Sequence, residues 1–455
     1  MKKIKYIALL SALLLTACNK FLDVQPKGVI IPTKIGDYEG LLNSPTVTQT
    51  FSPELLYMTD DVYQYTLTTN TSTITNAYLW RQYINAESQN SPAVWGNLYN
   101  AIYFTNVIIN GVPSATDGTA AQKQELLGEA LFLRAYCYMD LLTVFAKAYN
   151  SSTAASDPGL PLVTSTDVSE AAPQRSSVKA VLDTITANLQ KAAISLPATN
   201  INKYRATKYA AYALLSRIAL YQGDYTNAGN FAGQALAATH STLDYNTFTS
   251  LTDFPTSSSN PEVLYQRTSS NYSIPFQVEY SDDLTSYFGS QPFTSNPDLR
   301  YRYLSATYLD GITRMSPDPV YSNFGMTFPE MDLTRAEVFA RTGDISDAMT
   351  IVNTLRKNRI DAASYSDMTA SSASDALTKV LAERRRELAF GGLRWFDMKR
   401  LNRDGLMTDV VRINRAQASS GTPAQQIGDL PPGSPNYTFQ IPSRVQQFNP
   451  NMIKN

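Results

Sequence analysis

Histidine and cysteine are nearly absent from this 455-residue chain, which has one histidine and two cysteines. The single histidine, His240, excludes zinc motifs built on paired histidines and leaves a Ser-His-Asp arrangement only one possible base. Two cysteines cannot form a disulfide framework, and Cys137 falls among apolar residues, as a buried thiol does. The chain has no Walker loop, Rossmann fingerprint or nucleophile elbow. These absences weigh against the common enzyme classes, and they indicate neither a cofactor nor a metal.

An excess of charge is also missing. The formal net charge is −1 and the pI is about 6.0. A nucleic-acid-binding protein carries a basic stripe, which this composition does not provide. Tyrosine, by contrast, is abundant, with 28 residues. Its flat ring and hydroxyl suit sugars and peptides as well as ordinary cores.

The N-terminus has the layout of a secretory signal peptide. Lysines at positions 2, 3 and 5 precede an apolar run over residues 7–15, which is too short to span a bilayer. Residues 15–18, Leu-Thr-Ala-Cys, look like a bacterial lipobox. We expect residues 1–17 to be removed and Cys18 to carry lipid, which would tether an otherwise soluble domain over residues 18–455. An accidental cysteine after a plain signal peptide is the alternative.

Two helical hairpins share one pattern. Residues 209–240 have apolar side chains at helical spacing on both sides of Gly223-Asp224, and residues 331–359 repeat this around Gly343-Asp344. Glycine can end the first helix and aspartate can cap the second. Each hairpin resembles a tetratricopeptide unit. Further helices are expected at residues 92–109, 121–149 and 178–195, so the sequence predicts a mainly α fold, an α-α superhelix whose scaffold covers about residues 92–240 and 330–401.

Two loop-rich excursions interrupt this pattern, at about residues 48–90 and 241–321. Both are rich in Ser, Thr, Asn and Tyr, with only short strand-like pieces. Aromatic residues in such stretches are harder to assign to a core than those on an amphipathic helix. We therefore expect the excursions to form a ligand face, although the aromatics could instead pack the loops onto the helices. The candidate contacts, with the first two preferred, are Trp80, Arg81, Tyr65, Tyr272 and Tyr321.

Adjacent carboxylates occur at Asp60-Asp61 and Asp282-Asp283. They could in principle serve a glycosidase or bind calcium. A glycosidase needs two carboxylates that face each other at about 5 Å or 6.5–9.5 Å, which neighbours on a loop do not guarantee. We expect solvated loop acids and no catalysis.

Residues 377–401 predict a helix, a turn at Gly391-Gly392 and a second short helix. Glu383, Arg384 and Glu387 have the spacing to pair on the helix surface. The expected inward-facing residues are Leu381, Leu388 and Phe390. From the residues alone, this segment is mostly structural.

Several stretches together resemble the SusD/RagB family of outer-membrane nutrient-binding lipoproteins. The chain begins, after the lipobox, with CNKFLDVQPKG at residues 18–28, and it has Gly-Leu-Pro-Leu at 159–162. The tail carries Ile-Pro at 441–442 and Asn-Pro at 449–450. The most specific match is a Glu-Arg-x-x-Glu-Leu-x-Phe motif with a following Gly-x-Arg and an aromatic-Asp pair: Glu383, Arg384, Glu387, Leu388, Phe390, Gly392, Arg394, Phe396 and Asp397. Gly391 stands where the family usually has Glu.

The resemblance implies a lipid-anchored protein of the outer membrane, facing the cell surface. Such a protein binds oligosaccharides and delivers them to a SusC-type TonB-dependent transporter, on which the helical repeats would rest. No bond would be broken. Peptide capture is the alternative ligand class, a lipid-anchored glycosidase the alternative enzyme, and a purely structural surface protein a third possibility.

Overall fold

The computed structural model describes residues 32–63, 72–89, 91–269, 278–307, 313–315, 323–414 and 423–455. Helices dominate these residues, and the strands are short, as expected. The longer helices are α2 (Ile35–Leu42), α6 (Ala93–Gly111), α7 (Ala120–Phe145), α8 (Val178–Ser195), α9 (Lys208–Gln222), α10 (Tyr225–Ala235), α13 (Phe328–Thr342), α14 (Ile345–Lys357), α15 (Ala373–Glu387) and α16 (Arg394–Arg403).

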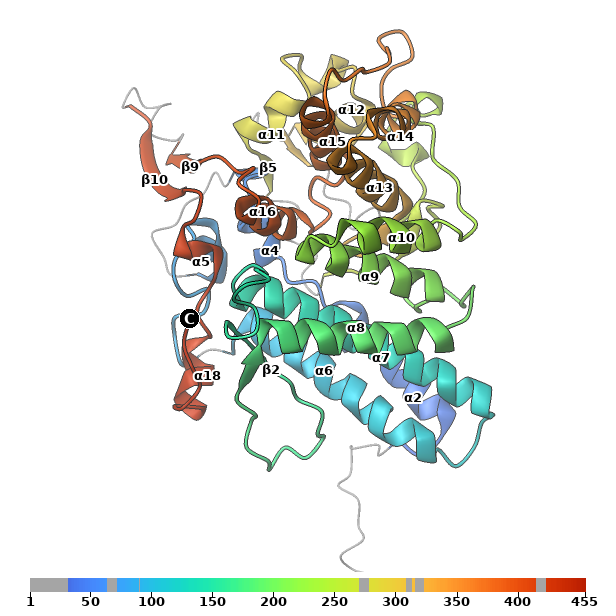
Figure 1. Cartoon of the computed structure of the whole chain (residues 1–455), viewed down its shortest axis with the longest axis vertical. Coiled ribbons are helices and arrows are strands. Elements are labelled where there is room, and N and C mark those ends of the chain that lie inside the picture. The colour runs from blue at the N-terminus through green and yellow to red at the C-terminus, as the bar shows by residue number, and fades with distance from the viewer. Residues whose placement is uncertain are drawn as a thin grey trace, which may run out of the picture.

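The helices α6 to α15 stack into a column that runs from the bottom to the top of Figure 1. Each helix from α6 to α10 packs on the next one along the chain, and α10 then packs on α13, which also contacts α14 and α15. The second excursion lies between α10 and α13 in the sequence, yet these helices are neighbours in space. The predicted interrupted superhelix is confirmed.

The two predicted hairpin turns have the same backbone geometry. Gly223 and Gly343 have φ angles of 78° and 91° in the left-handed region, where glycine is favoured. The carboxylates of Asp224 and Asp344 each accept a backbone N–H from the first turn of the next helix at 3.1 Å. Ala228 is fully buried, as is its counterpart in the second hairpin. Small buried residues allow the paired helices to approach closely.

Helix α7 ends at Phe145, four residues earlier than expected. Its last carbonyls are occupied by side chains of α16. The Trp395 indole donates to the Thr143 carbonyl at 3.1 Å, and the Lys399 ammonium donates to it at 2.8 Å and also to the Ala146 carbonyl. Lys399 is fully buried, and this burial lowers the pKa of Lys399 to about 7.

The two excursions meet in one antiparallel sheet of order β1-β5-β7-β6. Val62 of β1 pairs with Tyr280 of β5, so residues from both excursions share a hydrogen-bonded ladder. The strands are β1 (Val62–Tyr63), β5 (Glu279–Tyr280), β6 (Ser305–Thr307) and β7 (Thr313–Met315). Short helices flank this sheet: α4 (Glu54–Tyr57), α5 (Thr73–Tyr78), α11 (Asp282–Tyr287) and α12 (Leu299–Tyr303).

A β-hairpin that the sequence did not suggest follows α16. Strands β9 (Val410–Asn414) and β10 (Gln425–Leu430) pair antiparallel, with an irregular register between Gln426 and Gly428. In Figure 1 the hairpin extends from the upper left of the molecule, above α5 and the C-terminal helix α18 (Ser443–Phe448). The remaining small strands pair β2 (Pro158–Pro161) with β3 (Arg175–Ser177) and β4 (Val263–Tyr265) with β8 (Met326–Thr327).

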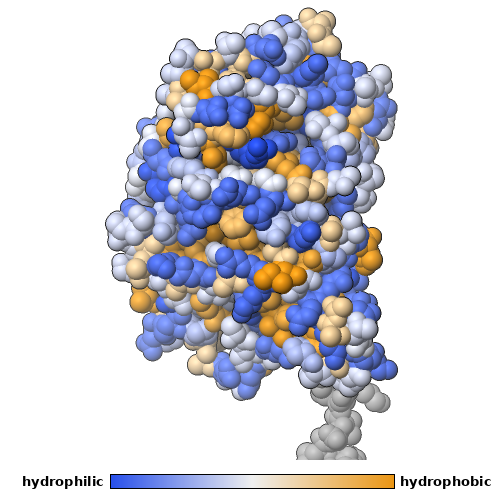
Figure 2. Space-filling model, turned by 45° about the vertical axis from the view of Figure 1, so that its right-hand side comes forward, coloured by the Kyte–Doolittle hydropathy of each residue, from blue (hydrophilic) through white to orange (hydrophobic). Residues whose placement is uncertain are grey.

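The surface of the helical column mixes polar and apolar side chains. In Figure 2 the apolar residues form several small groups between hydrophilic ones. Scattered exposed apolar residues are normal on soluble proteins. Within the described ranges, no helix combines the length and hydropathy that crossing a membrane requires.

Candidate ligand-binding site

The charged segment 377–401 is built differently from the prediction. Glu383, Arg384 and Arg385 are buried, whereas Leu381 and Leu388 are only half-buried. The expected pairing of Glu383 and Glu387 with Arg384 along the helix surface is therefore wrong. Glu383, Arg384 and Glu387 instead pair with residues on other elements, and Glu383 also pairs with Arg386 one turn further along α15.

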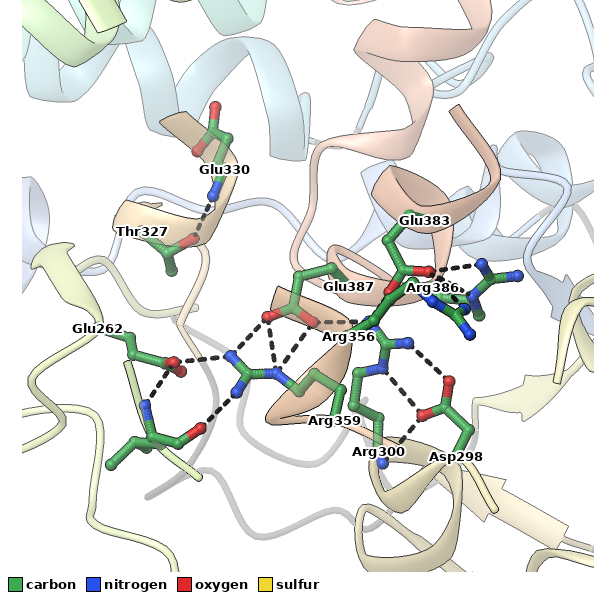
Figure 3. A network of polar contacts seen from close by, with 11 residues as sticks. Glu262, Asp298, Arg300, Thr327, Glu330, Arg356, Arg359, Glu383, Arg386 and Glu387 are labelled. Carbon is green, nitrogen blue, oxygen red and sulfur yellow. Dashed lines mark hydrogen bonds and ion pairs between the residues drawn. The ribbon is translucent and has the colours of Figure 1, made fainter. Parts of the chain in front are cut away.

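Figure 3 shows the two carboxylates in place. Glu383 pairs with Arg300 at 2.8 Å and with Arg386 at 2.5 Å. Glu387 pairs with Arg300 at 2.8 Å and with Arg359 at 2.9 Å, and Arg359 continues to Glu262 at 2.6 Å. Because Arg300 and Glu262 belong to the second excursion, this network attaches the excursion to α15.

Arg384 makes a second set of buried contacts. Its guanidinium pairs with Asp397 of α16 at 2.9 Å. Asp397 also accepts from Arg400 at 2.7 Å, and Arg400 pairs with Glu337 of α13 at 2.6 Å. Alternating positive and negative side chains thus link the turn between α15 and α16 to α13 of the helical column.

Two further arginines hold the first excursion. Arg394 donates to both oxygens of Asp60 at 2.7 Å, and Arg385 donates to Asp61 at 2.7 Å and to Asp283 of the second excursion at 2.7 Å. We call these five residues the arginine junction. It joins both excursions to α15 and α16.

The arginine junction corrects the expectation of solvated loop acids at Asp60-Asp61, because both side chains are buried. Burial alone would raise the pKa of Asp60, but the Arg394 and Arg385 guanidiniums hold it below its ordinary value. Burial and the Asp60 charge raise the pKa of Asp61, against the opposing effect of Arg385. Both carboxylates of this sequence pair are therefore partners in buried ion pairs.

A cavity of about 470 Å³ opens over the arginine junction. Its wall comes from three parts of the chain far apart in sequence, with Arg385 and Arg394 in addition. These parts are the first excursion (Asp60, Val62, Tyr63, Tyr78), the second excursion (Ser281, Asp282, Asp283, Tyr287) and the segment 406–413, which includes most of β9. The volume falls in the range of small-molecule sites in proteins.

Tyr78 is part of this cavity wall, but its hydroxyl is buried. Tyr78 is fully buried, and among the described residues its hydroxyl makes no hydrogen bond. The guanidinium of Arg412 lies over the Tyr78 ring, 4.1 Å from its centroid, and donates to the backbone carbonyls of Val62 and Thr59 at 2.6 Å. A buried hydroxyl without a hydrogen-bond partner costs free energy relative to a hydroxyl in water.

Tyr287 provides a half-buried aromatic ring in the same wall. The Arg385 guanidinium lies 4.7 Å from the ring centroid, which fixes the ring against the arginine junction. Leu406 and Val411 are exposed apolar residues of the third segment. The wall therefore combines apolar surface with polar groups held in defined positions.

The predicted ligand contacts have different outcomes. Trp80 is only 1% exposed, and its indole donates to the Met58 carbonyl at 2.7 Å. This burial corrects the prediction for Trp80, because neither face of the ring is open to a sugar. Arg81 is exposed and donates to the Asn76 side chain at 2.9 Å. Outside the described residues lie the other predicted contacts, Tyr65, Tyr272 and Tyr321, and the lipidation site Cys18.

Several site residues were not among the predicted contacts. Arg385 and Arg394 were missed because helical periodicity assigns charges to the surface, and Asp283 was expected to be a solvated loop acid. Segment 406–413 carried no recognised motif. The signal that could have revealed part of the site was already present: Asp60, Tyr63 and Tyr78 lie in the first excursion, where aromatics and acids gather in a polar stretch.

The remaining polar candidates have local partners. The His240 ring stacks on Phe328 with centroids 4.1 Å apart, and its Nδ1 lies 2.8 Å from the Ala238 carbonyl oxygen. Cys137 is buried, and burial raises the pKa of its thiol to about 12. In the described part of the chain, no group of three or more His, Cys, Asp or Glu residues is arranged to hold a metal ion.

Comparisons with known proteins agree on one family. Residues 20–220 match a family model described as "Starch-binding associating with outer membrane", and residues 327–455 match the model of the SusD family. A SusD-like protein of Formosa agariphila is 22% identical over 389 residues, covering 70% of this chain and 74% of that protein.

Solved structures have the same fold. A SusD superfamily protein of Bacteroides thetaiotaomicron aligns with a TM-score of 0.76 at 19% identity, covering 93% of this chain and 99% of that one. A putative sugar binding protein of Bacteroides vulgatus aligns with a TM-score of 0.74 at 21% identity, covering 94% and 99%. At these identities the structural likeness establishes the fold alone. The two family models together match more than half of the chain, and they show that it belongs to the SusD family.

Proposed function

We propose that this protein binds oligosaccharides in the 470 Å³ cavity over the arginine junction and delivers them to a SusC-type TonB-dependent transporter. The observation that carries the proposal is that both loop excursions, expected from the sequence to form the ligand face, contribute to one cavity wall. Related proteins described as sugar binding and SusD-like carbohydrate binding support a sugar as the ligand class.

Sugar recognition needs apolar faces for the ring carbons and fixed polar groups for the hydroxyls. Tyr287 supplies a ring, and Asp283 supplies an exposed carboxylate. The arginine junction holds these groups before a ligand arrives. Such preorganisation reduces the entropy lost on binding.

Four predicted contacts remain part of the proposal. Arg81 is an exposed residue of the first excursion, and Tyr65 stands two residues after Tyr63 of the cavity wall. Tyr272 and Tyr321 belong to the second excursion. We propose that these residues extend the ligand contacts beyond the described wall.

The protein would bind its ligand without cleaving it. Asp60 and Asp61 are neutralised by guanidiniums, so they are not available as a catalytic pair. Purified protein is therefore expected to release no reducing sugar from oligosaccharides. Release that disappeared in an Asp60→Asn variant would overturn this part of the proposal in favour of a glycosidase.

Calorimetric titration of the purified protein with neutral oligosaccharides and with peptides of similar length tests the ligand class. We expect saturable binding of at least one oligosaccharide and a loss of about tenfold or more in affinity for Tyr287→Ala, because stacking on one aromatic ring contributes about 1–2 kcal/mol. Tyr103→Ala is the matched control, because Tyr103 is an exposed tyrosine of α6 that lies outside the cavity wall. Binding of peptides alone would favour the peptide-binding alternative, and binding of neither class would favour a structural protein.

The anchor and the transporter contact form the second half of the proposal. Cys18 would hold the protein on the outer membrane, and the helical column would rest on the transporter. The column offers large exposed apolar side chains, with Ile194 87% and Ile201 76% exposed. Co-purification of a transporter from detergent-solubilised membranes tests this arrangement, and Cys18→Ala is expected to release the protein from the membrane fraction.

A further inference from the structure

The cavity wall contains both signs of charge, but they differ in exposure. Its charged residues are Asp60, Asp282, Asp283, Asp409, Arg385, Arg394 and Arg412. The Arg385 side chain is 3% exposed and the Arg394 side chain 12%, while the Asp283 side chain is 62% exposed. Asp282 and Asp409 are also exposed. Every exposed charged residue of this described wall is therefore a carboxylate.

The buried guanidiniums are already engaged. Arg385 directs its nitrogens to Asp61, Asp283 and Asp60, and Arg394 holds Asp60 through two of its nitrogens. The hydrogen bonds that Arg412 makes to described residues go to backbone carbonyls, including those of Val62 and Thr59 at 2.6 Å. An anionic ligand would have to displace these contacts before it could pair with a guanidinium.

The net charge of the cavity wall also disfavours an anionic ligand. The wall carries four carboxylates, those of Asp60, Asp282, Asp283 and Asp409, against the three guanidiniums of Arg385, Arg394 and Arg412. A ligand carboxylate or sulfate in this cavity would lose part of its hydration and meet a net negative wall. Like charges a few ångströms apart in a partly enclosed site repel, because little water lies between them to screen the interaction.

We infer that this cavity selects uncharged sugars and rejects uronic acid and sulfated sugars. The inference deepens the proposed function and rests on it. The exposed carboxylates of the wall determine which sugars bind. The buried arginines serve as ion-pair partners of Asp60, Asp61 and Asp283.

The test uses ligands that differ only in charge. Maltohexaose, cellohexaose and mannohexaose form the neutral panel, and each is converted by selective oxidation of its C6 hydroxymethyl groups into the corresponding uronate. The methyl ester of each uronate restores neutrality while keeping the C6 carbonyl. At low ionic strength we expect the uronate to bind roughly tenfold or more weakly than both neutral forms. Added salt should narrow this gap, because it screens the repulsion.

Variants then locate the effect. Asp409→Asn is expected to reduce the ratio of neutral to uronate affinity, because it removes one exposed carboxylate from the wall. Asp183→Asn makes the same change at an exposed position of α8 outside the wall, and the ratio is expected to stay at its wild-type value.

Two failures are distinguishable. If the uronates bind as tightly as the neutral hexaoses, or more tightly, the charge selection is overturned while oligosaccharide binding stands. If no hexaose, ester or uronate binds, the proposed function fails and the charge selection fails with it.

Discussion

The α9–α10 hairpin and the α15–α16 turn both join two helices, but they are stabilised by different forces. The hairpin packs fully buried apolar residues such as Leu214, Ala228 and Ala232, and its turn is set by Gly223 and Asp224. The α15–α16 turn buries charges whose partners lie on distant segments, as in the arginine junction. A hairpin of the first kind is specified locally. A turn of the second kind depends on segments that must already be in position.

This difference bears on function. The excursions have short elements, and they are attached to the helices both by apolar residues that join the main core, such as Leu55 and Phe288, and by the buried arginines. Replacing a buried ion pair as a whole can be nearly neutral, whereas removing one partner is strongly destabilising. The charged turn is therefore the more vulnerable of the two, and the following predictions test that order, beginning with the largest effect.

Arg400→Met is expected to lower the free energy of unfolding by about 3–5 kcal/mol, because it leaves Glu337 and Asp397 buried without one of their guanidinium partners. Urea denaturation followed by circular dichroism measures the change. The double variant Arg400→Met/Glu337→Leu should recover part of the loss, since one unpaired carboxylate is removed with its partner. A loss below 1 kcal/mol for the single variant would contradict the comparison.

Lowering the pH from 6 to 3 is expected to reduce the free energy of unfolding by about 3 kcal/mol, through the buried carboxylates of the charged turn. Although burial opposes the effect, Arg300 and Arg386 lower the pKa of Glu383 to about 2, and arginines lower the pKa of Asp397 likewise to about 2. Folded-state pKa values below the unfolded ones give stability that is complete above about pH 4.5 and is lost as the pH falls toward 2. Urea denaturation at pH 6 and pH 3 measures this slope.

The variant Glu383→Gln supplies the control for the acid effect. It removes one titrating group, so its stability at pH 6 is expected to be lower and its loss between pH 6 and pH 3 smaller than in the wild type. An unchanged slope would show that the buried carboxylates do not govern acid sensitivity.

Gly343→Ala tests the locally specified hairpin and is expected to cost about 1 kcal/mol. The φ angle of 91° is unfavourable for alanine, while nothing lies close enough to clash with the added methyl group. Gly233→Ala is the matched control: it lies inside α10 in open space and should stabilise the protein by about 0.5–1 kcal/mol. Thermal unfolding of both variants gives the comparison, and equal effects of one sign would contradict it.

The exposed ion pair Lys179–Asp183 is expected to have the smallest effect on the free energy of unfolding. Its atoms are 2.7 Å apart, but both side chains are more than half exposed. Lys179→Ala should change the free energy of unfolding by no more than about 0.5 kcal/mol, because solvent screens exposed ion pairs. A cost comparable to that of Arg400→Met would mean that burial does not decide the strength of these pairs.

Much of the scaffold could be predicted because its signals are local. Gly223-Asp224 and Gly343-Asp344 predicted two turns of the same kind, and both formed. The site was predictable only as a region. Trp80 was misjudged because a polar surrounding sequence does not show that a ring is buried by residues elsewhere in the chain.

The rest depends on contacts that sequence spacing does not encode. Arg385 meets Asp61 across more than 300 residues, and no periodicity connects them. The same holds for segment 406–413, which becomes part of the cavity only because α16 is fixed against α7 and the excursions. Burial of charge reverses the usual pattern in which charged residues mark the surface.

Lys399 offers a way to observe how α16 and α7 separate. In mildly alkaline solution, acylating reagents react with the neutral fraction of a lysine amine that reaches solvent, and the amine of Lys399 would react in this way after opening. It is nevertheless shielded, because it lies fully buried against the carbonyls of Thr143 and Ala146. Its labelling rate is therefore expected to report the frequency of local opening between the two helices, in the way that hydrogen exchange reports the opening of a backbone amide.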